Sequence, residues 1–203
     1  MRFSSRELRD LAIAWVALGI AFTFFLDREL AQGLLEGRLP VGDAIVTLAL
    51  SMGTVGVGFL LHELAHKVVA VRFDQVAEFR ADYGMLVLAV GAGLAGFLFA
   101  APGAVYHSGY ITERENGLIA IAGPLTNVAL AALFLPLLLV PGLEQVGQLG
   151  VTINLLLGAF NMIPFGPLDG RKVLSWSKVV FGVTFVGCAG LAAGAFLYVG
   201  TGF

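Results

Sequence analysis

The sequence predicts an all-α, multi-pass membrane protein with about six transmembrane helices, and two observations support this fold class. Of its 203 residues, 58% are hydrophobic and 13% are charged, whereas an ordinary soluble domain carries about 25% charged residues. The mean hydropathy is +0.90, and apolar runs that approach the length of a membrane span recur along the chain. We therefore expect one integral domain, 1–203, in the cell membrane.

Crossing a bilayer takes about 20 predominantly apolar residues in a helix. Runs of this kind lie at 11–26, 44–71, 83–106, 117–143, 146–168 and 179–203. The first follows three arginines and superficially resembles a signal peptide, but no small-residue cleavage site follows it, so we interpret it as a membrane anchor. The Gly/Ala-rich third run is predicted to be either an added helix or a membrane-embedded loop.

The polar links between these runs are too short for a folded soluble domain. Two of them, "RFDQVAEFRADYG" and "APGAVYHSGYITERENG", have aromatic and β-branched content, which predicts small strands or β-hairpins at the membrane edge. The fifth run contains "PFGPLDG", with two prolines and two glycines in seven residues, and such a segment must break a helix. Broken backbone at membrane depth is tolerated only where it is buried in protein or lines a watery cavity.

The motif His62-Glu63-Leu64-Ala65-His66 lies directly after an uncharged stretch. Residues i and i+4 of a helix share one face, so both imidazoles can reach one metal ion. Glu63 can then contact a water bound to that ion as a general base, as in metalloproteases. A carboxylate inside a membrane segment is costly and usually marks function. The neighbouring Lys67 has no role in this scheme, and we expect it to extend toward the membrane interface.

A catalytic zinc site usually has three protein ligands and one open position. Most of the 14 acidic residues lie in the N-terminal arm, in links or at segment ends, and only Glu63 and Asp169 interrupt membrane-like sequence. His107 lies in a polar link and is more typical of a structural residue than of a ligand. Elimination therefore favours His62, His66 and Asp169, with Asp169 located at the predicted helix break.

These motifs together resemble the site-2 protease family of intramembrane zinc metalloproteases. The HExxH motif is followed about 100 residues later by "NMIPFGPLDG", from Asn161 to Gly170, and "AGPLTN", 122–127, is a third similar element. The resemblance covers about 45–175. Many members of that family carry a PDZ or CBS domain, for which this chain has no room, so it resembles a minimal form.

The resemblance implies one Zn²⁺ per chain, a zinc-activated water with Glu63 as its base, and regulated cleavage of transmembrane proteins within the lipid bilayer. It also implies that Asn161 helps to place the substrate or the developing oxyanion, although from the residues alone Asn161 could equally satisfy backbone freed at the break. Substrate selection would then depend on the membrane domain or on separate regulatory or adaptor proteins.

Two other functions stay open at this point. A membrane metal or ion transporter would also use intramembrane histidine and aspartate, with Asn127, Asn154 and Asn161 as the clearest further polar residues. An inactive relative that serves as a scaffold is the third hypothesis, although both motifs are complete. The net charge of −2 provides no basic surface for nucleic acid, and the single cysteine excludes an internal disulfide or a cysteine-based zinc cluster.

Overall fold

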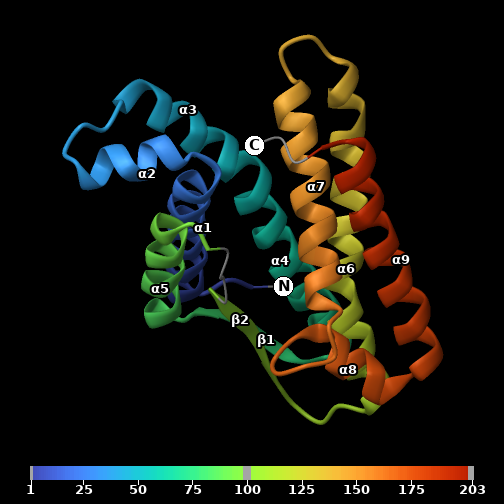
Figure 1. Ribbon diagram of the computed structural model, residues 1–203. Helices are drawn as coiled ribbons and strands as arrows, with labels where there is room; N and C mark the ends of the chain where they lie inside the picture. The colour runs from blue at the N-terminus through green and yellow to red at the C-terminus, as the bar shows by residue number, and fades with distance from the viewer. Residues whose placement is uncertain (1, 98–101, 201–203) are drawn as a thin grey trace. The chain divides into compact units, whose positions relative to one another are not determined.

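The computed structural model describes residues 2–97 and 102–200, and within them the chain is mostly helical with one small sheet (Figure 1). Its elements in order are α1 (Ser5–Leu26), α2 (Arg28–Leu35), α3 (Val41–Ser51), η1 (Met52–Gly56), α4 (Val57–Arg72), β1 (Val76–Ala81), α5 (Tyr83–Ala95), β2 (Gly103–Ser108), α6 (Glu113–Phe134), η2 (Leu135–Leu139), α7 (Glu144–Asn161), α8 (Asp169–Trp176) and α9 (Lys178–Tyr198).

Four helices in the described part of the chain are long and apolar enough to cross a membrane. They span Ser5–Leu26, Val41–Arg72, Glu113–Leu139 and Lys178–Tyr198. Each coincides with one of the six predicted runs, but the number six is not confirmed. The third run forms only the 13-residue helix α5 and then the strand β2, and its residues 98–101 lie outside the described residues. The fifth run forms α7, whose buried face includes Thr152 and Asn154.

The helix break in the fifth run is present where the prolines and glycines predict it. Helix α7 ends at Asn161, a turn follows, and α8 begins at Asp169. The two polar links form the small strands that their composition predicts, one strand in each. Strands β1 and β2 pair with each other in a two-stranded sheet although α5 lies between them in the chain, because each link supplies one strand only.

The described residues divide into two compact units. The first comprises 58–78 and 105–200, and the second comprises 2–57, 79–97 and 102–104. In the first unit α7 packs against both α6 and α9, and α8 packs against α6 and α9. A buried core of Ala131, Val151, Leu155, Ala192 and Ala195 joins α6, α7 and α9.

In the second unit α1 packs against α3 and α5. The Trp15 indole donates a hydrogen bond to the Met52 carbonyl (3.1 Å) in the π-helical turn η1, and thereby satisfies an acceptor in a segment whose hydrogen-bond pattern departs from the α-helix. The helix that carries the HExxH motif continues directly from this turn.

Candidate metal centre

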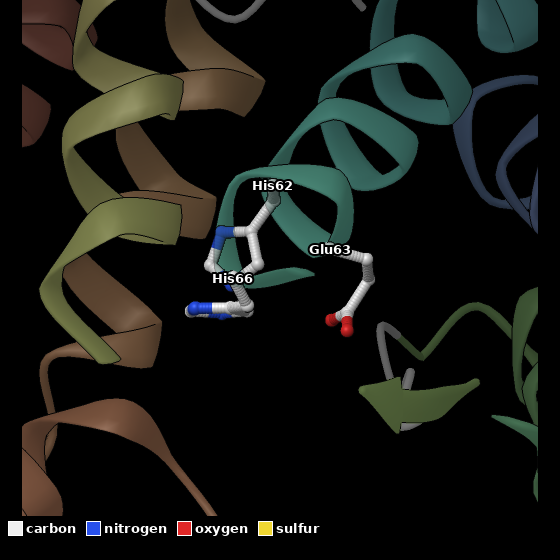
Figure 2. Close-up of side chains that lie close together, drawn as sticks. All are labelled: His62, Glu63 and His66. Atoms are coloured by element: carbon white, nitrogen blue, oxygen red, sulfur yellow. The ribbon is translucent and has the colours of Figure 1, made fainter. Parts of the chain in front are cut away.

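Helix α4 places His62 and His66 one turn apart on one face. Their rings lie edge to face with centroids 4.6 Å apart, and both residues are buried. Figure 2 shows the two imidazoles together on one side of the helix, while the carboxylate of Glu63 extends on the other side. The ligand-capable atoms of these three residues lie within 4.8 Å of one another.

The first residue of α8, Asp169, meets the two histidines. Its Oδ2 atom lies 3.2 Å from His62 Nε2 and 3.2 Å from His66 Nε2. This oxygen is buried and has no hydrogen-bond partner. The break after α7 therefore brings the carboxylate to the same point as both Nε2 atoms, although Asp169 lies about 100 residues further along the chain.

The other nitrogen of each imidazole is already engaged. His62 Nδ1 lies 2.6 Å from Asn127 Oδ1, and His66 Nδ1 lies 2.8 Å from the carbonyl oxygen of Ile119. Both partners on α6 are acceptors, so each Nδ1 carries a hydrogen, and in the neutral imidazole, the form that binds a metal, each Nε2 presents a lone pair. Metal-bound histidines typically have this arrangement, with the second nitrogen donating to a carbonyl or carboxylate oxygen.

Three acceptor atoms thus converge with no donor between them. Their mutual repulsion is relieved by a cation, and two imidazole nitrogens with one carboxylate oxygen suit zinc, whose catalytic sites have three protein ligands and one open position. The residues present fit a zinc ion on this ground. A proton shared among the three groups would instead give a buried ion pair, which metal analysis distinguishes.

Helix α6 also supplies the space that the two rings occupy. A Cβ atom on Gly123 would lie 2.5 Å from His62 Nε2 and 2.6 Å from His66 Cε1. Any side chain at this position would therefore displace the imidazoles. Asn127 follows Gly123 by one turn on the same helix face. On this face Gly123 leaves room for the two rings, and Asn127 accepts a hydrogen bond from His62.

Glu63 is held by the backbone of β2. Its Oε2 atom accepts a hydrogen bond from the Val105 amide (3.1 Å), and the side chain is buried. The strand thus orients the Glu63 carboxylate next to the histidines. The carboxylate bonds to the strand and is not one of the three acceptors that converge at Asp169 Oδ2. Sequence reasoning missed this contact because nothing in the sequence pairs β2 with α4.

Two more predicted residues occupy other positions. His107 lies on β2, and neither His107 nor Asp169 belongs to the group of His62, Glu63 and His66 described above; among the described residues no close contact joins His107 to the two imidazoles as the 3.2 Å distances join Asp169. Partial burial together with the charge of Lys172 lowers the pKa of the His107 imidazole. Asn161, at the end of α7, donates its amide hydrogen to the Leu157 carbonyl of its own helix (3.0 Å). The Leu157 carbonyl lies within α7 and is not freed by the break, so both predicted roles of Asn161, toward freed backbone and toward substrate, stay predictions.

The expectation for Lys67 is wrong. The residue is 1% exposed and is among the largest fully buried side chains of the described structure, so its ammonium group does not extend to a membrane interface. Its place next to the second histidine on an interior turn of α4 accounts for the burial, because that turn faces protein and not lipid.

Comparison with known proteins identifies relatives along most of the chain. It is 42% identical over 188 residues to "Putative zinc metalloprotease MJ0611" of Methanocaldococcus jannaschii, covering 90% of both chains. It is 31% identical over 147 residues to "Putative zinc metalloprotease YwhC" of Bacillus subtilis, covering 60% of this chain and 65% of that one.

A third relative, "Putative zinc metalloprotease Rip3" of Mycobacterium tuberculosis, is 34% identical over 143 residues, which are 67% of this chain and 30% of Rip3. No family model matches the chain, and no solved structure matches it. The identity and coverage of the archaeal relative show that the chain belongs to this zinc metalloprotease family, in agreement with its resemblance to site-2 proteases.

Proposed function

We propose that the protein is an intramembrane zinc metalloprotease that hydrolyses peptide bonds of transmembrane proteins, with His62, His66 and Asp169 as the zinc ligands and Glu63 as the general base. The observation that carries the proposal is the buried, unpartnered Asp169 Oδ2 atom at 3.2 Å from both histidine nitrogens. Family membership supports the activity, and the four long apolar helices support the location.

When bound, zinc supplies Lewis acidity: it lowers the pKa of a coordinated water to about 7 and polarises a carbonyl oxygen. The chain's own residues supply the proton transfer. The Val105 amide holds one oxygen of the Glu63 carboxylate, and this fixes the carboxylate where it takes a proton from the attacking water. The same group then returns that proton to the leaving amine.

The helix break between α7 and α8 has a second role in this proposal, which concerns binding of the substrate. A substrate helix hides its carbonyl groups in hydrogen bonds, so it must unwind locally before attack. Asp169 follows the turn between α7 and α8 directly and reaches both histidines, and Val105 of β2 bonds to Glu63. Both segments thus provide non-helical backbone close to the proposed site, where an unwound segment finds hydrogen-bonding partners.

The test is cleavage of a model transmembrane substrate by purified protein, together with metal analysis. We expect about one zinc per chain and cleavage that ceases on chelation and returns with added zinc. Absence of zinc from a folded, zinc-supplied protein would refute the proposal. Cleavage by a Glu63→Gln protein would refute the assigned mechanism but not the metal site.

The transporter hypothesis has less support than it had from sequence. Of its polar residues, Asn127 and Asn154 are fully buried and are bonded to His62 and to helix carbonyls, so they do not line a route for ions. A transporter also needs no general base, and Glu63→Gln should leave transport intact while it abolishes proteolysis.

A further inference from the structure

A buried amide relay connects the metal centre to two other helices. Asn127 on α6 and Asn154 on α7 are both 0% exposed. The Asn127 amide nitrogen donates to Asn154 Oδ1 (3.0 Å) and to the Gly58 carbonyl (3.2 Å). The Asn154 amide nitrogen donates to the Gly150 carbonyl of its own helix (2.8 Å).

These bonds fix which end of each amide faces which partner. Asn154 must direct its nitrogen at Gly150, so its oxygen faces Asn127. Asn127 then directs its nitrogen at two acceptors, and only its oxygen is left for His62 Nδ1, 2.6 Å away. An amide oxygen cannot donate. His62 therefore carries its hydrogen on Nδ1, and its Nε2 lone pair faces Asp169 Oδ2.

The relay is packed so that it cannot readily rotate. A Cβ atom on Gly58 would lie 2.5 Å from Asn154 Oδ1, so the close approach of α4 to α7 requires glycine at this point. The side-chain oxygen and nitrogen of each asparagine have partners, and a fully satisfied buried network of this kind is rigid.

The two histidines differ in how they are held. His66 donates to a backbone carbonyl, that of Ile119, which no side-chain substitution removes. His62 donates to the side chain of Asn127, so its orientation depends on one residue that is not among the proposed zinc ligands. A substitution of Asn127 can therefore change the orientation of the His62 ring and leave the His62 side chain itself in place.

We infer that Asn127, oriented by Asn154, is a positioning residue that holds His62 in its Nδ1–H form and thereby sets the affinity of the site for zinc. The inference rests on the proposed zinc site and deepens it. It also assigns a role to the sequence element "AGPLTN", in which Gly123 leaves room for the rings and Asn127 fixes one of them.

The experiment compares zinc affinity of the purified full chain with that of three variants, by competition with a chromophoric chelator. Asn127→Leu removes the acceptor at similar size, and we expect affinity to fall about 10–100-fold, the usual effect of losing such a partner. Asn127→Asp keeps an acceptor for Nδ1, and we expect it to bind zinc more tightly than the leucine variant.

The matched control is Thr126→Val, one residue earlier on α6. It removes the hydrogen bond from Thr126 Oγ1 to the Ala122 carbonyl (2.8 Å) of the same helix, and we expect zinc affinity within about twofold of wild type. A folded Asn127→Leu protein that binds zinc as the wild type does, or an aspartate variant no better than the leucine variant, would overturn the inference.

A measurement on the unchanged protein keeps the test decisive if Asn127→Leu does not fold. The chain has three histidines, so ¹⁵N NMR of histidine-labelled protein can resolve each ring, with His62→Gln for assignment. We expect His62 to carry hydrogen on Nδ1, and a neutral ring with its hydrogen on Nε2 instead of Nδ1 would overturn the inference. If the wild type binds no zinc, the proposed function itself fails. If wild type and leucine variant bind zinc equally, only this inference fails.

Discussion

Two pairs of buried carboxylates differ sharply in what surrounds them. Glu63 and Asp169 belong to the metal centre, whereas Glu7 and Asp10 lie on α1 in the other compact unit. All four are less than a tenth exposed. Burial of an acid in an apolar chain is therefore not, by itself, evidence of a catalytic site.

The pair on α1 is matched by donors. Glu7 Oε1 accepts from the Phe79 amide (3.0 Å), and Asp10 Oδ1 accepts from the Tyr83 hydroxyl (2.6 Å). Asp10 Oδ2 accepts from the Ala81 amide (3.4 Å). Since alternate residues of a strand direct their amides to the same edge, the two carboxylates cover one edge of β1 and fasten it to α1.

In the metal-centre pair only one member is matched in this way: Glu63 accepts from the Val105 amide (3.1 Å), but Asp169 is not matched. Asp169 Oδ2 has no donor and instead faces two histidine nitrogens. The comparison teaches that an unmatched buried acceptor, more than burial, identifies the functional carboxylate. It also adds to the elimination argument, because the N-terminal arm that holds Glu7 and Asp10 forms the first turns of α1, where both side chains are buried.

The largest effect is expected from Asp169→Asn. It replaces one oxygen ligand by an amide and removes the negative charge, so we expect zinc affinity to fall by more than about 100-fold, beyond the range for loss of an outer partner. Chelator competition measures it, and cleavage should fall in parallel. Near-normal zinc binding by the variant would place the third ligand elsewhere.

Glu63→Gln should affect chemistry and not metal binding. The variant keeps an oxygen that can accept from the Val105 amide but loses the base, so cleavage should fall about 10²–10⁴-fold while zinc content stays near wild type. Initial cleavage rates and metal analysis on the same preparation check this. Loss of zinc along with activity would instead assign Glu63 as a ligand.

For the pair on α1, Tyr83→Phe removes the hydroxyl that donates to Asp10. We expect the free energy of unfolding to fall by about 1.5–3 kcal/mol, the usual range for a hydrogen bond to a charged group, with no change in zinc affinity. Denaturant titration in detergent measures the first and chelator competition the second. A changed zinc affinity would contradict the distinction between a structural carboxylate pair on α1 and a metal-binding pair.

The smallest effect is expected from Lys172→Met. The Lys172 ammonium lies 3.7 Å from Asp169 Oδ1, where its charge disfavours a second cation, but it is partly exposed and the pair is screened. We expect zinc affinity to rise by at most about fivefold, equivalent to about 1 kcal/mol. The effect should shrink at high salt, and a fall in affinity would show that the lysine supports the carboxylate.

Much of this protein follows from the sequence by itself. The apolar runs predict helices in apolar surroundings, because the length and hydropathy of each run can be taken from that run alone. The spacing of His62 and His66 fixes their common helix face, and the prolines and glycines before Asp169 determine the break after α7. The apolar helices, the shared helix face and the helix break each depend on residues that are neighbours in the chain. Each can therefore be predicted from the sequence without knowledge of the tertiary structure.

Tertiary structure decided the rest. Only the packing of distant segments places Asp169 next to both imidazoles. It also places Asn127 within hydrogen-bonding distance of His62 and the Val105 amide within hydrogen-bonding distance of Glu63. It also buries Lys67, Glu7 and Asp10, gives the third run a 13-residue helix and a strand, and pairs the strands of two separate polar links in one sheet. The physical reason is common to these cases: donors and acceptors on distant segments must satisfy one another where water is excluded, and sequence spacing carries no record of which distant groups will meet.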